Sequence, residues 1–118
     1  MNAFLKRLQY ALAGWCVFFA RETNGQIQLV IAIIVIATGF LLQLQPWEWV
    51  AVLLCIGAVL GLEMVNTAIE KLADHLHPGR HEQVSIVKDV AAGAVLWAAA
   101  ISVVVGVIVF GPKLLELF

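Results

Sequence analysis

Charge is what this sequence has least of. Asp, Glu, Lys and Arg make up only 13% of its 118 residues, about half the usual share in globular chains, and 63% of the residues are hydrophobic. No charged residue occurs within 23–47, 49–62 or 90–112. A single small core cannot hide this much apolar surface from water, which excludes an ordinary soluble domain. We therefore expect an integral membrane protein, built as one domain over residues 1–118.

A basic excess, paired cysteines and nucleotide-loop motifs are also lacking. The formal charge of −1 gives no case for a nucleic-acid partner. Cys16 and Cys55 stand in separate apolar segments without a CxxC spacing, so we expect both to pack as small apolar residues. Neither GxxxxGK nor GxGxxG occurs, which excludes the soluble kinase folds that use these loops. The run 8–20 follows Lys6 and Arg7 as in a signal peptide, but polar interruptions and the lack of a small-x-small site argue against cleavage.

Long apolar runs with helical periodicity are what the sequence does contain. In residues 2–21 the apolar groups recur at helical spacing, which predicts an amphipathic helix lying in the membrane interface. Three membrane-spanning helices are predicted at 27–44, 48–73 and 86–110, with lengths that suit a hydrocarbon core of about 30 Å. The expected fold is therefore all-α and membrane-integral.

Proline, glycine and serine mark the expected helix ends. Pro46 is expected to end the first span, and Ser85 to cap the start of the third. Gly111 and Pro112 are expected to end that third helix. Between the second and third spans, residues 74–84 read as a polar loop.

Basic residues gather on one side of the predicted spans. By the positive-inside rule, this places the N-terminus and the 74–84 loop in the cytoplasm. The opposite side has no basic residue in the 43–49 turn and only Lys113 near the end of the chain. The flanking basic residues are Lys6, Arg7, Arg21, Lys71, Arg80 and Lys88.

A polar stripe follows the fourteen uncharged residues 49–62 in the second span. At about 100° per residue, its members share an arc of roughly 80° on one helix face. Ionisable groups inside a spanning helix are costly and indicate function by default. The stripe consists of Glu63, Asn66, Glu70 and Asp74.

Depth separates the roles of the two glutamates in this stripe. Glu63 and Glu70 are seven residues apart, or about 10 Å along the axis, which is too far for both to bind one Mg²⁺. Glu70, near the cytoplasm, suits a metal ion that carries phosphates, with Glu22 as the best-placed second carboxylate. Glu63, deeper and poorly solvated, suits proton transfer. Lys88, near a helix N-terminus, suits a phosphate.

The residues alone leave other roles open. The stripe could instead line the path of a small proton- or ion-coupled transporter with Glu63 as its relay, or hold an inactive scaffold together. Lys88 and Asp89 also fit a pair that snorkels to the interface. The spacing of three loop histidines fits no closed zinc set, so a solvated loop is expected there: His75, His77 and His81.

The second and third spans carry a specific pair of motifs. Together they closely resemble the bacterial diacylglycerol kinase and undecaprenol kinase family, over roughly residues 4–112. Upstream, Tyr10-Ala11-x-x-Gly14 and Glu22-x-Asn24 look like the N-terminal signature of that family. The motifs are Glu63-x-x-Asn66-Thr67-Ala68-x-Glu70-x-x-x-Asp74, then His81, then Lys88-Asp89-x-Ala91-Ala92-Gly93-Ala94-Val95.

This resemblance implies an ATP-dependent lipid kinase of the bacterial inner membrane, a homotrimeric bundle with one interfacial and three spanning helices per subunit and with sites shared between subunits. Glu63 looks like the base for the primary hydroxyl of the lipid. Glu22 and Glu70 look like the carboxylates that hold Mg²⁺ with ATP. The other implied nucleotide-binding residues are Asn66, Lys88, Asp89, Tyr10 and His81.

Two departures from the family pattern concern charge. Gln26 stands where the family usually has a basic residue, and Ala13 where Lys or Arg is common. Neither affects the carboxylates or Lys88. The sequence motif from Lys88 to Val95 resembles the undecaprenol kinase branch more than the enterobacterial diacylglycerol kinases. Both diacylglycerol and undecaprenol stay open as substrates.

Overall fold

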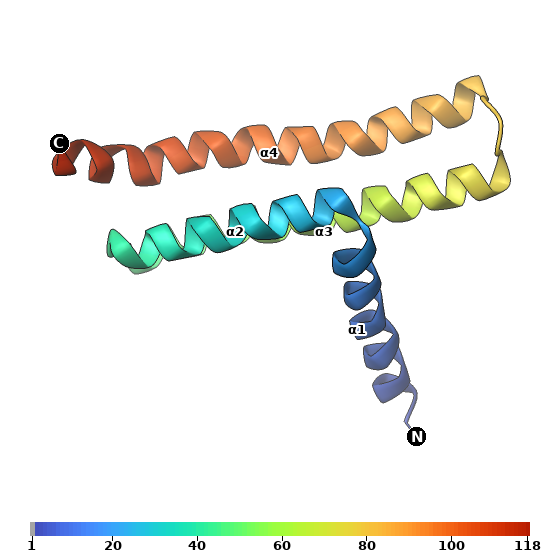
Figure 1. The fold of residues 1–118 in the computed structure, drawn as a ribbon, viewed down its shortest axis with the longest axis horizontal. Coiled ribbons are helices and arrows are strands. Elements are labelled where there is room, and N and C mark those ends of the chain that lie inside the picture. The colour runs from blue at the N-terminus through green and yellow to red at the C-terminus, as the bar shows by residue number, and fades with distance from the viewer. Residues whose placement is uncertain (1) are drawn as a thin grey trace.

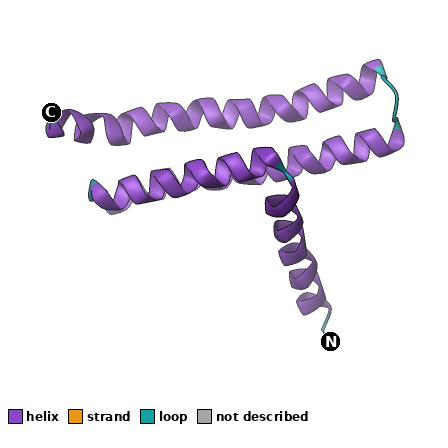
Figure 2. Ribbon diagram, viewed as in Figure 1, coloured by secondary structure: helices purple, strands orange, loops and turns teal. Residues whose placement is uncertain are grey.

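The computed structural model describes residues 2–118 and consists of four α-helices (Figure 1). Figure 2 shows that short connections join the helices and that no strand occurs within residues 2–118. The predicted all-α fold is confirmed, since three of the helices are long and apolar enough to cross a membrane. The helices are α1 (Ala3–Arg21), α2 (Thr23–Leu41), α3 (Pro46–Leu76) and α4 (Glu82–Leu117).

Helices α2, α3 and α4 run along a common direction, and α1 crosses it (Figure 1). Helix α3 packs against α4 and α2, whereas α1 contacts α2. A small apolar cluster near the α2–α3 turn contains Leu44, Val52 and Val109. Helix α3 is therefore the central element, and its buried face decides what the other helices surround.

The spanning helices differ in length. Helix α2 has 19 residues, or about 28 Å, which matches the hydrocarbon core. Helix α3 has 31 residues, or about 46 Å. Helix α4 has 36 residues, or about 54 Å. Because the hydrocarbon core is only about 30 Å thick, several turns of α3 and α4 extend beyond α2.

The first break in the chain is shorter than the sequence predicts. Polar residues suggested a break over 21–26, with the first span at 27–44, but Glu22 alone separates α1 from α2. The Gln26 side chain donates hydrogen bonds to the carbonyls of Phe19 and Ala20, at 3.1 and 3.2 Å. Those bonds satisfy the end of α1, so the polar residues can form the first turn of α2.

The turn between α2 and α3 also differs from expectation. Pro46 does not end the first span, because α2 already stops at Leu41. Pro46 is instead the first residue of α3, where a missing backbone N–H costs nothing. Gln45 and Glu48 form a reciprocal capping box around it, in which the Gln45 backbone N–H donates to Glu48 Oε1 at 2.9 Å.

The predicted ends of the third span are wrong in two places. His81, not Ser85, caps α4, and its Nδ1 accepts from the Val84 backbone N–H at 3.4 Å. Helix α4 also continues through Gly111 and Pro112 to Leu117. These ends start α4 four residues before the expected 86 and extend it past the expected 110.

An ion pair explains why α4 persists beyond its proline. Lys113 Nζ lies 3.1 Å from Glu48 Oε1, and the two side chains are 23% and 8% exposed. The glutamate lies in the first turn of α3, so its charge also complements the dipole of that helix. This contact fixes the last turns of α4 against the start of α3.

The corner between α1 and α2 provides a test of packing. An alanine Cβ at Gly25 would lie 2.6 Å from the Phe18 ring, which is closer than such contacts allow. We expect Gly25→Ala to destabilise the protein by about 1–3 kcal/mol, because the buried ring must move. Thermal unfolding in detergent measures this effect. Gly14→Ala is the control, since a Cβ there meets nothing within 4 Å. Equal midpoints for the two variants would contradict the packing of this corner.

Candidate active site

The polar stripe continues the buried face of α3. Val52 and Val59 on this face are 3% and 7% exposed. Glu63 and Asn66, which follow them at helical spacing, are 4% and 6% exposed. Two polar residues thus occupy positions that apolar residues fill earlier in the same helix. This placement directs them toward the neighbouring helices.

Glu63 is isolated as well as buried. Within residues 2–118 its carboxylate forms no side-chain hydrogen bond and no ion pair. A carboxylate that is both desolvated and unpaired is costly to retain unless it has a task. Glu63 is therefore available to accept a proton from a ligand.

Asn66 bridges the deep and shallow parts of the stripe. Its Nδ2 donates to Glu70 Oε1 at 3.3 Å. Its Oδ1 is buried and has no hydrogen-bond partner in the structure. Buried acceptors normally have a donor, so this oxygen indicates a position completed by a ligand or by another chain.

Glu22 faces α3 through an ion pair. Lys71 Nζ lies 2.9 Å from Glu22 Oε1, with side chains 66% and 26% exposed. Glu22 is held at the α1–α2 corner because its backbone N–H donates to the Phe18 carbonyl at 2.9 Å. Lys71 directly follows Glu70 in α3, so the ion pair brings Glu22 to the part of α3 that carries Glu70.

The lysine of the third span is paired with the last acid of the stripe. Lys88 Nζ lies 2.7 Å from Asp74 Oδ1, which joins α3 to α4. Asp89 is exposed. Lys88 thus lies beside the stripe, as predicted, but its charge is already balanced by Asp74.

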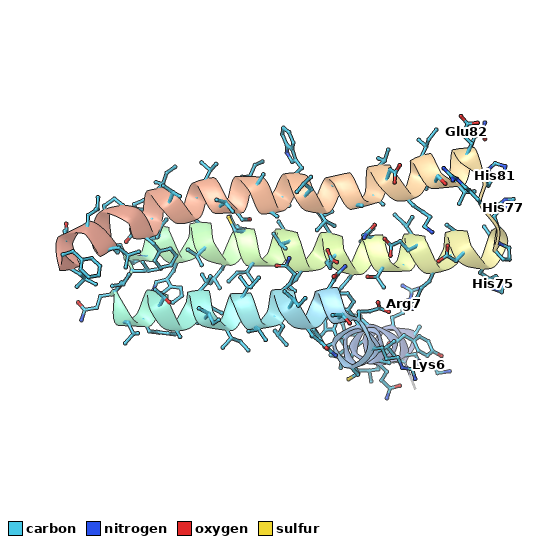
Figure 3. All side chains as sticks on the ribbon, turned by 45° about the horizontal axis from the view of Figure 1, so that its top comes forward. Lys6, Arg7, His75, His77, His81 and Glu82 are labelled. Atoms are coloured by element: carbon cyan, nitrogen blue, oxygen red, sulfur yellow. The ribbon has the colours of Figure 1, made fainter. Side chains whose placement is uncertain are left out.

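Two further predicted residues lie outside this network. Tyr10 is 73% exposed on α1. His81 caps α4, and its ring centroid lies 4.8 Å from that of His77. Figure 3 shows His75, His77, His81 and Glu82 at the connection between α3 and α4, beyond the stripe. A single chain therefore does not bring Tyr10 or His81 into contact with the other site residues.

The carboxylates fit a magnesium ion that is shared with phosphates. Within residues 2–118, no three His, Cys, Asp or Glu side chains lie close enough to hold a metal by themselves. Mg²⁺ commonly uses one or two carboxylates and completes its shell with water and substrate phosphates. Of the two carboxylates predicted to hold the metal, Glu22 already lies against a cation, so it accommodates positive charge.

Comparison with known proteins decides the family. The model of the family "Prokaryotic diacylglycerol kinase" matches residues 9–110, which contain nearly all of the site described above. The chain belongs to the prokaryotic diacylglycerol kinase family. It is an integral membrane lipid kinase, and nothing in the comparisons supports the alternative of a transporter.

Two relatives illustrate the range of this kinase family. An undecaprenol kinase of Bacillus subtilis is 38% identical over 114 residues, which cover 97% of this chain and 93% of the relative. A diacylglycerol kinase of Synechocystis is 39% identical over 115 residues, which cover 96% of this chain but 65% of that longer relative. The chain thus resembles kinases named for two different lipids.

The sequence did not predict the two ion pairs at the kinase site, Lys71 with Glu22 and Lys88 with Asp74. Lys71 was counted only as a flanking basic residue, and Asp74 only as a member of the stripe. One signal was available, because Lys71 is the single basic residue between Glu63 and Asp74. Its partner could not be found from the sequence, since Glu22 is 49 positions away.

Asn66 provides a test that separates function from stability in this lipid kinase. An unsatisfied buried acceptor costs about 1–3 kcal/mol, so Asn66→Leu removes a cost along with the bond to Glu70. We expect the midpoint of thermal unfolding to stay level or rise, while kinase activity falls by at least about 100-fold. Val65→Leu, at an exposed neighbouring position, is the control. A lower midpoint in Asn66→Leu would show that the amide is structural.

Proposed function

We propose that this kinase transfers the γ-phosphoryl group of MgATP to the primary hydroxyl of a membrane lipid alcohol, either diacylglycerol or undecaprenol. The observation that carries the proposal is the buried, unpaired carboxylate of Glu63. Glu63 lies eight residues before Lys71, or about 12 Å deeper than the Glu22–Lys71 pair along α3. A hydroxyl just below the headgroups would reach that level.

Glu63 acts as the general base in this reaction. Its carboxylate takes the proton of the lipid hydroxyl as the oxygen attacks the γ-phosphorus, and the bond to the β-phosphate oxygen breaks, so ADP leaves. Burial favours this role because it fixes the side chain among the helices. The surrounding helices also exclude water, which would otherwise compete as the acceptor.

The shallower residues bind the nucleotide. Glu22 and Glu70 would hold Mg²⁺, which neutralises phosphate charge when bound. Lys88 would contact the phosphates, and Asn66 has a second Nδ2 hydrogen to donate beside the bond it makes with Glu70. Asp89 would help hold the nucleotide, with Tyr10 and His81 completing the site.

The exposure and charge of the side chains support a proposed subunit arrangement and membrane orientation. Tyr10 and His81 lie apart from the stripe within one chain, which supports a homotrimer whose sites combine residues from neighbouring subunits. An exposed apolar surface on all three spans agrees with contact between subunits and with lipid. The excess of Lys and Arg at this end supports a bacterial inner-membrane protein with its N-terminus and 74–84 loop in the cytoplasm. No nucleic-acid partner is proposed.

The first test is phosphoryl transfer itself. Purified protein in detergent is given γ-labelled ATP, Mg²⁺ and either diacylglycerol or undecaprenol. We expect labelled lipid phosphate, because the site needs only a hydroxyl at the level of Glu63, and the larger kcat/KM identifies the better substrate. Triacylglycerol and undecaprenyl acetate, which lack the free hydroxyl, are matched controls. Lack of product with both alcohols, where a known family member works, would refute the proposal.

The second test separates the two glutamates. We expect Glu63→Gln to lower kcat by about 100-fold or more while MgATP binds normally, since the base acts only in the chemical step. Glu70→Gln should instead weaken binding of the metal–nucleotide complex. Equilibrium binding of a non-hydrolysable ATP analogue with Mg²⁺, measured beside turnover, gives both values. Equal losses of binding in the two variants would contradict the division of roles.

A further inference from the structure

Lys71 is a charged residue beside the polar stripe of α3 to which the proposed reaction gives no task. It lies between Glu70 and Asp74, and its ammonium group is 2.9 Å from Glu22 Oε1. Its side chain is 66% exposed, so the four-carbon stem is free to move around its point of attachment. Helix α3 therefore carries a mobile cation next to both proposed metal ligands.

Carboxylates outnumber lysines among the residues of the site itself. Among the surface-level residues of the site, four carboxylates stand against two lysines, which leaves a net charge of −2. The incoming metal–nucleotide complex is itself an anion. Each lysine that can turn from a carboxylate to a phosphate therefore changes the balance of attraction. The residues counted are Glu22, Glu70, Asp74, Asp89, Lys71 and Lys88.

We propose that Lys71 is a positioning residue that occupies Glu22 in place of the metal and turns to the nucleotide phosphates when either the nucleotide or the metal arrives. The Glu22–Lys71 pair holds the α1–α2 corner against α3. Metal binding to Glu22 releases the ammonium group within reach of the phosphates that the metal carries. The ion pair is thus exchanged rather than lost.

If Lys71 exchanges in this way, its removal should change the affinities for the metal and for the nucleotide in opposite directions. Removing Lys71 removes a competitor at Glu22, so a divalent ion alone binds more tightly. The same change removes a cation from the phosphate side, so metal-free nucleotide binds more weakly. A surface ion pair that serves stability alone would change neither affinity.

The experiment uses the full-length protein in detergent and needs no turnover. Mn²⁺ binding is titrated by electron paramagnetic resonance, and binding of a metal-free, non-hydrolysable ATP analogue by calorimetry. For Lys71→Met we expect Mn²⁺ affinity to rise and analogue affinity to fall, each by about two- to five-fold, the scale of an exposed ion pair. Lys71→Arg should keep both affinities near those of the unaltered chain, because it retains the charge.

Lys6→Met is the matched control, since it removes the same charge from α1 at a residue that forms no ion pair within residues 2–118. Unchanged affinities in Lys71→Met, or changes equal to those in Lys6→Met, would overturn the proposal. The inference rests on the proposed function, but the two fail differently. If the unaltered chain binds neither Mn²⁺ nor the analogue, the proposed nucleotide site fails; if it binds both and Lys71→Met binds them equally well, only the exchange fails.

Discussion

The thickness of the hydrocarbon core governs this structure. Helix α2 has 19 residues and fits that thickness, whereas α3 and α4 have 31 and 36. Within residues 2–118 the chain forms four helices and no separate nucleotide-binding domain. The proposed nucleotide site lies instead on the surplus turns of the two longer helices, which carry the residues from Glu70 to Asp89. In this lipid kinase the proposed site thus depends on helix length, whereas soluble kinases use a dedicated nucleotide-binding fold.

Helix α3 uses one face for both packing and chemistry. Val52 and Val59 pack among the helices, and Glu63 and Asn66 continue the same face toward the membrane surface. The register that buries the valines therefore also determines the direction of the carboxylate. A rotation of α3 that exposed Glu63 to lipid would simultaneously expose the valines and bury residues from its opposite side. The apolar core thus holds the base in place without a hydrogen bond to it.

The sequence predicts the spans and the stripe well, because both depend on local periodicity. It predicts helix ends poorly, because these depend on side chains that arrive from elsewhere. Pro112 does not end α4, since Glu48 from the start of α3 holds Lys113. The same limit applies to the site. Glu63, Asn66 and Glu70 follow from spacing on one helix, whereas the partner of Lys71 depends on how the α1–α2 corner packs, with Gly25 against Phe18.

The polar side chains of the site differ with depth in whether they have a hydrogen-bond or ion-pair partner, and this difference favours a different substrate at each depth. At the surface, Glu22 and Asp74 already hold lysines at 2.9 and 2.7 Å, and such pairs can be exchanged for a metal and for phosphates. Deeper in α3, Glu63 is buried without an ion pair within residues 2–118, and the Oδ1 of Asn66 is a buried acceptor without a donor there. An anionic phosphate cannot satisfy an acceptor, but a hydroxyl can, because it brings a proton to donate. The deep end of the polar stripe therefore favours a neutral alcohol and the shallow end an anion carrying a cation, which is the order in which a lipid and MgATP would meet at a membrane surface.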